Sequence, residues 1–218
     1  MRDAVTVMEA VKLSEGYLRR HGVDSPRLSA EHLLAKALGC SRLDLYLRHA
    51  EAVAESALES CRGDLRRRAE RFPLQYILGR VEFCSLPFAM AEGVFIPRPE
   101  TELLVERAGE LVGGFERARF LEFGTGSGVI AGALAAAHPS WTGVALDISP
   151  AAAALAARNL RALGLGGRVA VLVADGFSAI CGAMCGSICG TICGGAAFDL
   201  LVANPPYIAS SEIDALQA

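Results

Sequence analysis

The spacing of apolar residues divides the chain into a helical first third and an alternating remainder. Up to about residue 72, apolar residues recur at the spacing of one helix face, with breaks near residues 22 and 39. The pair Ser25-Pro26 and Ser41 stand where helix-capping residues are typical. A longer fourth helix is expected from about Ala52 to Phe72.

Residues 73–100 have a different composition from the helices before them. The β-branched and aromatic residues of 73–83, interrupted by Gly79, predict a hairpin. Pro97 and Pro99 then fix the backbone around Arg98, and a helix is expected to follow and to end near Gly113. We therefore expect a helical domain over residues 1–72, a hairpin linker over 73–100 and a second domain over 101–218.

Short apolar runs alternate with helical stretches in the second domain. Strands are predicted at residues 119–123, 141–147, 168–174 and 198–203, and helices at 129–137 and 150–163. Such alternation is typical of a parallel sheet covered by helices on both faces. The predicted fold class is α/β, preceded by a small helical bundle and a β-hairpin.

The turn after the first predicted strand is rich in glycine. Glycine permits a tight turn that brings the backbone close to a ligand, and the helix that follows offers unpaired amide donors. The glycine spacing is shorter than that of a dehydrogenase, which makes a dehydrogenase the least favoured enzyme class. The candidate cofactor-binding residues of this loop are Gly124, Thr125, Gly126, Ser127 and Gly128.

Acidic residues stand at the ends of the predicted strands. Asp147 ends the second strand about 20 residues after the loop, where a carboxylate accepts the hydroxyls of a ribose. Glu122 would repel a diphosphate but suits a cationic amino or sulfonium group. Asp175, followed by Gly176, either accepts a hydrogen bond from an adenine amino group or is an ordinary turn residue. S-adenosylmethionine carries both cations and no phosphate, so it fits this set.

The fourth predicted strand runs into Asn204-Pro205-Pro206-Tyr207. Proline cannot donate to a sheet ladder, so the strand is expected to end at Asn204. The turn that follows presents an amide side chain, backbone carbonyl groups and a phenol ring. These groups can hold a planar, hydrogen-bonding substrate.

Taken together, these motifs resemble class I methyltransferases that modify planar amino or amide nitrogens. Two further segments narrow the resemblance to HemK-type glutamine methyltransferases, which act on peptide chain release factors; they are residues 73–83 and Phe95-Ile96-Pro97-Arg98-Pro99-Glu100-Thr101-Glu102. The helical N-terminal domain also resembles that of this family, and the likeness covers nearly the whole chain.

The resemblance implies transfer of a methyl group from S-adenosylmethionine to the glutamine of a Gly-Gly-Gln loop. On this sequence, the Asn204 side-chain oxygen and the Pro205 carbonyl would accept the two N–H groups of that glutamine. Tyr207 would pack on the amide face. Pro206 and Arg98 complete the substrate-binding residues, and Asn204 is also assigned to the cofactor.

Charge and hydropathy disfavour some of the alternative functions. The net charge of −3 lacks the basic excess of a nucleic-acid-binding chain, which disfavours a DNA adenine methyltransferase and direct contact with nucleic acid. No apolar run reaches the ~18 residues of a membrane span, so a cytoplasmic monomer without a membrane partner is expected. Glutamine methylation of a ribosomal protein and an inactive cofactor-binding fragment remain open.

Two features depart from the family pattern. Cysteine and glycine recur with a four-residue period over residues 181–195, which is not the paired spacing of a zinc site. We interpret this repeat as a low-complexity insertion and assign no metal ligands. The four predicted strands are fewer than a methyltransferase sheet of this class contains, so we expect a C-terminally truncated sequence.

Overall fold

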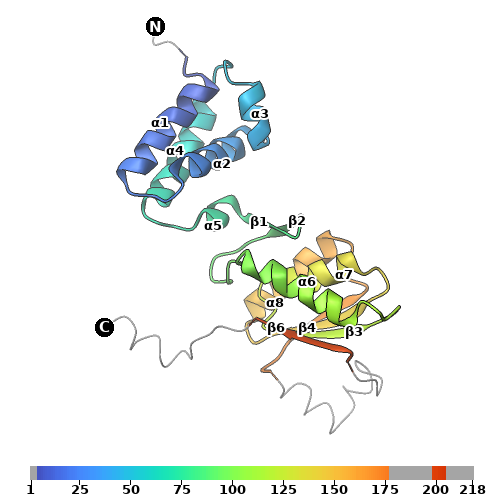
Figure 1. Cartoon of the computed structure of the whole chain (residues 1–218). Helices are drawn as coiled ribbons and strands as arrows, with labels where there is room; N and C mark the ends of the chain where they lie inside the picture. The colour runs from blue at the N-terminus through green and yellow to red at the C-terminus, as the bar shows by residue number, and fades with distance from the viewer. Residues whose placement is uncertain (1–3, 177–197, 205–218) are drawn as a thin grey trace. The chain divides into compact units, whose positions relative to one another are not determined.

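A computed structural model describes residues 4–176 and 198–204. The chain divides into two compact units, residues 1–80 and residues 81–218, which are described separately below (Figure 1). Within the described residues, no helix combines the length and the apolar character that a membrane span requires.

The first unit is a bundle of helices. Its core contains Leu18, Leu33, Leu45 and Ile77, all buried. Ser41 caps its helix as expected, whereas Ser25 adopts a left-handed backbone with φ of 49° and its side chain makes no cap. The helices are α1 (Val7–Arg20), α2 (Pro26–Leu38), α3 (Arg42–Leu47), α4 (Glu55–Ala69) and α5 (Leu74–Leu78).

A buried carboxylate attaches the short helix α3 to α2. Glu31 Oε1 accepts hydrogen bonds from Arg27 Nε at 3.0 Å and from the Tyr46 hydroxyl at 2.5 Å. Its other oxygen accepts from Arg42 Nη2 at 2.7 Å. A helix of six residues is too short to be stable alone. Its place in the bundle therefore depends on these contacts and on the burial of Leu45.

The hairpin expected over residues 73–83 is displaced in the structure. Residues 74–78 form helix α5, and the hairpin consists of β1 (Arg80–Phe83) and β2 (Leu86–Ala89). Gly79 has a φ of 68° and caps the end of α5, so the residue that predicted a strand turn ends a helix instead. Cys84 and Ser85 make the true turn with φ of 47° and 60°, as a two-residue hairpin loop requires.

The second unit contains a four-stranded parallel sheet in the order β5-β4-β3-β6. The expected strands and helices are present with shifts of up to two residues at their ends. The elements are α6 (Glu100–Val112), β3 (Arg119–Phe123), α7 (Val129–Ala137), β4 (Thr142–Asp147), α8 (Pro150–Ala162), β5 (Val169–Val173) and β6 (Leu200–Ala203).

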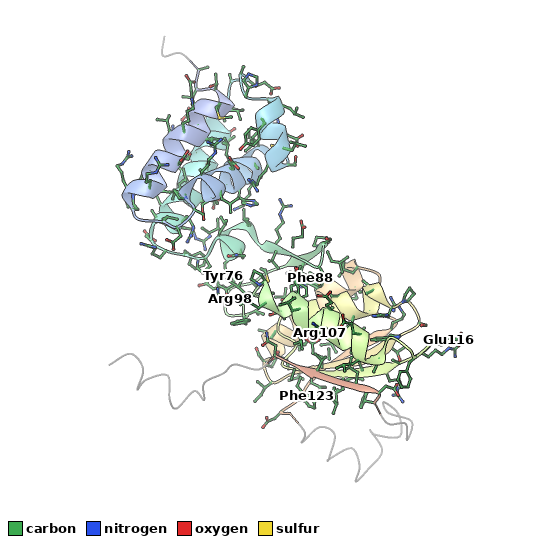
Figure 2. All side chains as sticks on the ribbon, viewed as in Figure 1. Tyr76, Phe88, Arg98, Arg107, Glu116 and Phe123 are labelled. Carbon is green, nitrogen blue, oxygen red and sulfur yellow. The ribbon has the colours of Figure 1, made fainter. Side chains whose placement is uncertain are left out.

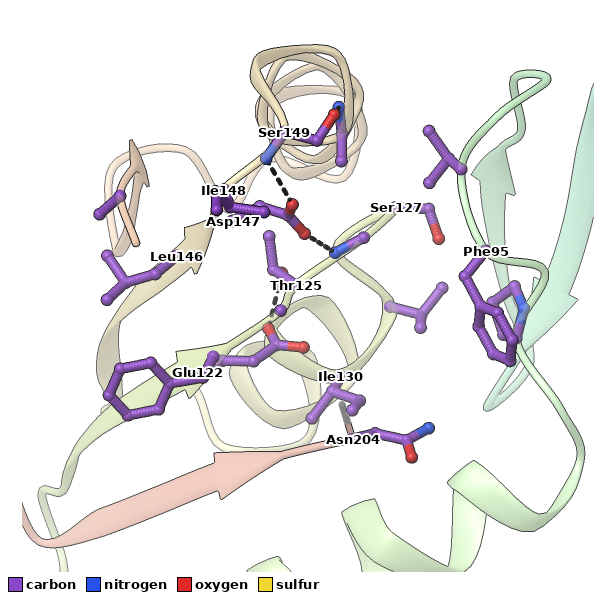
Figure 3. A pocket seen from close by; sticks show the side chains of 18 of the residues that line it. Phe95, Glu122, Thr125, Ser127, Ile130, Leu146, Asp147, Ile148, Ser149 and Asn204 are labelled. Atoms are coloured by element: carbon purple, nitrogen blue, oxygen red, sulfur yellow. Dashed lines mark hydrogen bonds between the residues drawn. The ribbon is translucent and has the colours of Figure 1, made fainter. Parts of the chain in front are cut away.

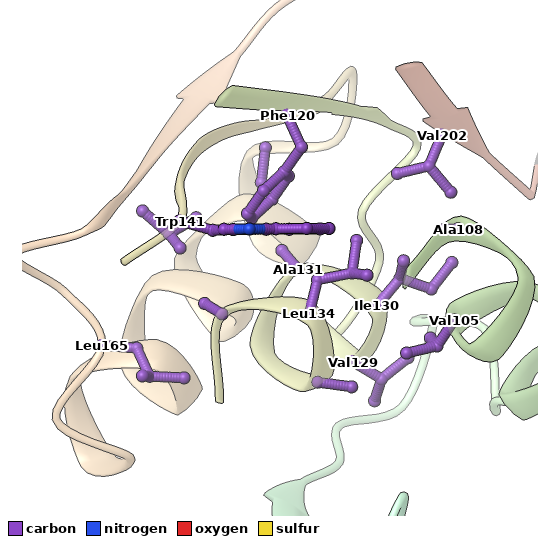
Figure 4. Close-up of a cluster of buried hydrophobic side chains, with 14 of the residues drawn as sticks. Val105, Ala108, Phe120, Val129, Ile130, Ala131, Leu134, Trp141, Leu165 and Val202 are labelled. Atoms are coloured by element: carbon purple, nitrogen blue, oxygen red, sulfur yellow. The ribbon is translucent and has the colours of Figure 1, made fainter. Parts of the chain in front are cut away.

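Helices α6, α7 and α8 contribute to one core on one face of the sheet (Figure 1). Helices on the opposite face, which the sequence also predicted, are not among the described residues. Residues 181–195, with the cysteine repeat, lie outside them as well. On the helix-covered face, Phe120, Leu134 and Trp141 are fully buried (Figure 4). Phe88 of the hairpin is buried in the same core (Figure 2).

Strand register determines which side chains face that core. Glu122 is paired with Val202 on one side and with Ala145 on the other. Neighbouring residues in a parallel ladder point to the same face, and Val202 and Ala145 belong to the core. The carboxyl group of Glu122 therefore lies under helix α7, on the covered face.

Candidate cofactor and substrate site

A cavity of about 640 Å³ opens at the carboxyl ends of the strands in the second unit (Figure 3). Ligands of open α/β sheets bind at this edge because the loops there leave a crevice between strand ends and helices. Its lining includes the glycine loop, the ends of β4, β5 and β6, the start of α6 and the segment after the hairpin.

The glycine loop depends on three left-handed backbone positions. Gly124, Gly126 and Gly128 have φ of 68°, 57° and 81°, a region that other residues rarely adopt. Gly128 has a second constraint, because a Cβ there would come within 3.0 Å of the Ala156 side chain on α8. Gly128 begins helix α7 and does not line the cavity, whereas the other four loop residues do.

Glu122 replaces the missing cap of helix α7. Gly128 has no side chain to satisfy the first amides of that helix, and Glu122 Oε2 accepts the Ala131 amide at 3.1 Å. The same oxygen accepts the Thr125 hydroxyl at 2.8 Å (Figure 3). Glu122 is 1% exposed, and its burial raises the pKa of the carboxyl to about 8.

Two buried side-chain oxygen atoms of the described residues have no hydrogen-bond partner, and both belong to residues that line this cavity. They are Glu122 Oε1 and Ser127 Oγ. An unpaired buried polar atom is costly, so such atoms indicate a missing partner. Both atoms can therefore bond a ligand or a water molecule in the cavity, and a cationic donor there would favour the charged form of Glu122.

Asp147 holds the glycine loop to the start of helix α8. Its Oδ2 accepts the Gly126 amide at 2.8 Å, and its Oδ1 accepts the Ser149 amide at 2.9 Å. Each carboxylate oxygen has lone pairs for a further bond, so both can also accept a ligand hydroxyl. Asp147 therefore shapes the site and lines it.

Asn159 joins the hairpin to the glycine loop, and this contact was not predicted. Its Oδ1 accepts the Ala89 amide at 2.9 Å, and its Nδ2 donates to the Ala89 carbonyl at 3.0 Å. The same Nδ2 donates to the Ser127 carbonyl at 2.8 Å. Asn159 is 3% exposed on α8. One buried amide thus ties the end of β2 to the glycine loop, and we refer to it as the Asn159 bridge.

Replacing Asn159 with aspartate is expected to reduce the free energy of unfolding by about 2 kcal/mol. The variant keeps the shape and the acceptor for Ala89 but turns a carboxylate oxygen toward two carbonyl groups. Urea unfolding measures the change, with Arg158→Ala, which alters an exposed residue of the same helix, as the matched control. Equal stability of the two variants would contradict the bridge.

Asn204 lies at the end of β6 and contacts helix α6. Its Nδ2 donates to Thr101 Oγ1 at 3.1 Å, and both residues line the cavity. Thr101 is 6% exposed in the first turn of α6. The structure therefore brings together Asn204, the glycine loop and Glu122, which are far apart in the sequence.

The other predicted site residues fall into three groups. Asp175 and Gly176 line the cavity as expected. Arg98 is exposed on the loop before α6 and does not line it. Pro205, Pro206 and Tyr207 lie outside the described residues.

Sequence reasoning missed several lining residues. Val94 and Phe95 come from the segment after the hairpin, and Ile148 follows Asp147. Phe95 and Ile148 are largely exposed apolar side chains, which was not evident from their position in the sequence. They give the cavity an apolar wall that suits the flat face of an aromatic ring.

Fold and site together define a nucleotide-type binding domain of the class I methyltransferase kind, preceded by a helical bundle. Residues 9–79 match the family described as PrmC N-terminal domain, and residues 88–217 match the methyltransferase small domain. The chain belongs to the family of release factor glutamine methyltransferases.

Individual relatives agree with this assignment. The release factor glutamine methyltransferase of Geobacter sulfurreducens is 41% identical over 212 residues, covering 97% of this chain and 69% of the relative. That of Chlorobaculum tepidum is 40% identical, with 97% and 71% covered. Separately from these relatives, a solved structure of a SAM-dependent methyltransferase from Agrobacterium tumefaciens is 20% identical with a TM-score of 0.46, covering 60% of this chain and 40% of that one, and the family assignment does not rest on it.

Proposed function

We propose that this protein transfers the methyl group of S-adenosylmethionine to the side-chain amide nitrogen of a release factor glutamine, in its Gly-Gly-Gln loop. The observation that carries the proposal is the unpaired, buried Glu122 Oε1 in a cavity that Asn204 also lines. The reaction needs a carboxyl group that binds the cationic cofactor and an oxygen that accepts a hydrogen bond from the substrate amide. Glu122 can supply the first and Asn204 the second. Family membership supports the same reaction.

The residues present fit S-adenosylmethionine. Glu122 suits a cationic donor, and Asp147 can accept ribose hydroxyls beyond its two backbone bonds. Asp175 and Gly176 would lie beside the adenine, and the apolar wall of Phe95 and Ile148 can pack against its ring. When bound, this cofactor supplies an electrophilic methyl group on sulfur.

The protein's own contribution to the reaction is positioning. An amide nitrogen is a weak nucleophile because its lone pair is delocalised into the carbonyl. In our proposal the Asn204 side-chain oxygen and the Pro205 carbonyl accept hydrogen bonds from the two N–H groups of the substrate amide. These bonds favour positive charge on the nitrogen and orient it toward the methyl group. In the same proposal Tyr207 would pack on the amide plane. Orientation of this kind supplies a large part of the rate enhancement of a bimolecular transfer.

Methyl-labelled S-adenosylmethionine tests the proposal against its alternatives. The protein is incubated separately with purified release factor, ribosomal protein and DNA. Label is expected on the release factor, and it should vanish when the loop glutamine of the release factor is replaced by alanine. Label on DNA, on the ribosomal protein alone, or on the alanine-substituted release factor would contradict the proposed substrate.

A further inference from the structure

We infer that the groove between helices α1 and α4 of the first unit binds an acidic, amphipathic segment of a protein partner. Apolar side chains of that segment would enter the groove, and its carboxylates would face the arginine residues at one end of the groove. The inference does not rest on the proposed reaction, because the cofactor cavity belongs to the second unit.

The groove exists because α1 and α4 both pack on α2 and contact each other much less. It has a volume of about 320 Å³, and the buried Leu34 of α2 lies at its base. Leu13 lines it and is still 66% exposed. Burial raises the pKa of the Cys61 thiol in the groove to about 11, so this group is neutral at pH 7. An apolar groove between two helices suits the apolar face of a partner helix.

Helices α1 and α4 run in the same direction, so their last turns lie at the same end of the bundle. The Val53 amide donates to the Val5 carbonyl at 2.9 Å shortly before the two helices begin. Beyond their other ends, Arg71 Nη1 lies 3.9 Å from Asp24 Oδ2. The basic residues of the two last turns are Arg19, Arg20, Arg66, Arg67 and Arg68.

Two arginine residues next to the groove have their charge available. Arg20 and Arg66 are exposed, and neither makes an ion pair or a side-chain hydrogen bond within the part of the chain that the structure describes. Arg66 lines the groove, and Arg20 follows the lining residue Tyr17 by one helical turn on the same face. Pairs within the bundle neutralise other arginine residues nearby: Arg19–Glu15, Arg62–Glu55 and Arg62–Glu59.

Arg71 adds a second observation, because its backbone is left-handed with φ of 68°. Its amide donates to the Arg68 carbonyl at 3.0 Å, at the end of a helix where glycine is the usual residue. Its ion pair with Asp24 joins two exposed side chains and adds little to stability. The fold gains little from arginine at this position, and strain of this kind is typical of functional residues. The charge that Arg71 brings to this end of the bundle is therefore its main contribution.

The balance of charge and apolar surface favours a protein over a nucleic acid. The first unit contains 14 Lys and Arg against 11 Asp and Glu, which is less than the basic excess of a chain that follows a phosphate backbone. Carboxylates are attracted by a few free arginine residues, and aliphatic side chains fill an apolar groove. An acidic, amphipathic segment satisfies both.

A synthetic peptide tests the inference on the full chain. Its probe sequence has leucine at every third and fourth position and glutamate elsewhere, and its control has the same composition in scrambled order. Fluorescence anisotropy should show the probe binding at least roughly tenfold tighter than the scrambled peptide. Equal affinity for the two peptides, or tighter binding of a single-stranded RNA of equal charge, would overturn the inference.

Two exposed positions of the groove provide variants that should fold normally. Leu13→Asp removes apolar contact and Arg66→Glu reverses a free charge, and each should weaken probe binding by roughly tenfold. Lys12→Asp is the matched control, because Lys12 is an exposed neighbour that does not line the groove. Its affinity should stay within about twofold at physiological salt. Unchanged binding in Leu13→Asp or Arg66→Glu would contradict the groove.

Arg71→Gly separates binding from stability. Glycine relieves the left-handed strain, so the urea midpoint should rise, whereas probe binding should weaken by roughly two- to fivefold through loss of one surface charge. Weaker binding by a more stable variant cannot result from unfolding. An Arg71→Gly variant that binds the probe as tightly as the unaltered protein would overturn the assignment of Arg71 to this surface.

Discussion

Replacing Asn204 with alanine is expected to lower kcat for methyl transfer by roughly 10²–10³-fold, the range found when one preorganised hydrogen-bonding group is removed from an active site. In the proposed reaction its oxygen holds one N–H of the substrate amide, and no other described side chain at the end of β6 can replace it. Binding of S-adenosylmethionine should weaken by no more than a few-fold, because Glu122 and Asp147 remain. Single-turnover transfer and calorimetry measure the two quantities.

Asn204→Asp is the matched control for that substitution. It keeps an acceptor oxygen of the same reach but loses the amide proton given to Thr101. Its kcat should fall between those of the alanine variant and the unaltered protein. An alanine variant that keeps a third or more of its kcat would remove Asn204 from the reaction.

The second large effect concerns the pH dependence of Glu122. The pKa of its carboxyl is raised from 4.5 to about 8 by burial, so the group is mainly protonated at pH 7. A cation bound against Oε1 favours the charged form, and binding should therefore expel close to one proton. Affinity for S-adenosylmethionine should rise by roughly tenfold per pH unit between pH 6 and 7. Calorimetry in two buffers of different protonation enthalpy measures the released proton directly.

Glu122→Gln should abolish both the released proton and the pH dependence. At pH 7 it should also weaken cofactor binding by roughly ten- to a hundredfold, as expected for loss of a hydrogen bond to a charged group.

The stability of the unliganded protein offers a further control. A carboxyl whose pKa is raised by folding stabilises the fold below pH 4.5, and this contribution is lost as the pH rises through about 8. The free energy of unfolding should fall across that window, and less so in Glu122→Gln. An unchanged slope in the variant would assign the pH dependence to other groups.

The sequence predicted the elements well where a single local signal defines them. The helix 129–137 was placed correctly because Gly128 precedes an apolar run, and β3 because its apolar residues stop at the glycine loop. The hairpin was misplaced because Gly79 is compatible with a strand turn and with a helix C-cap. The burial of Ile77 in the core of the first unit decided for the helix, and that contact is invisible in a local pattern.

The residues of the candidate site were likewise predicted where a local signal defines them and missed where a long-range contact does. Glycine loops and strand-end carboxylates have fixed positions in a βαβ unit, so Gly126, Glu122 and Asp147 were found from spacing. Thr101 and Asn159 were not found, because their partners lie 103 and 70 residues away. An asparagine on an otherwise apolar helix face was the only local sign of the Asn159 bridge. The exposure of Arg98 likewise depends on the path of the loop before α6, which the local sequence does not determine.

The Asn159 bridge also indicates which substitutions the site can tolerate. Every group that it contacts belongs to the backbone: the amide and carbonyl of Ala89 and the carbonyl of Ser127. Side chains at positions 89 and 127 can therefore change without breaking the bridge, as far as packing allows. Position 159 has no such freedom, because an acceptor and a two-proton donor are needed at the reach of one short side chain, and glutamine is one methylene too long. In a library of variants, many residues should be accepted at the positions that line the cavity, whereas only asparagine should be accepted at position 159.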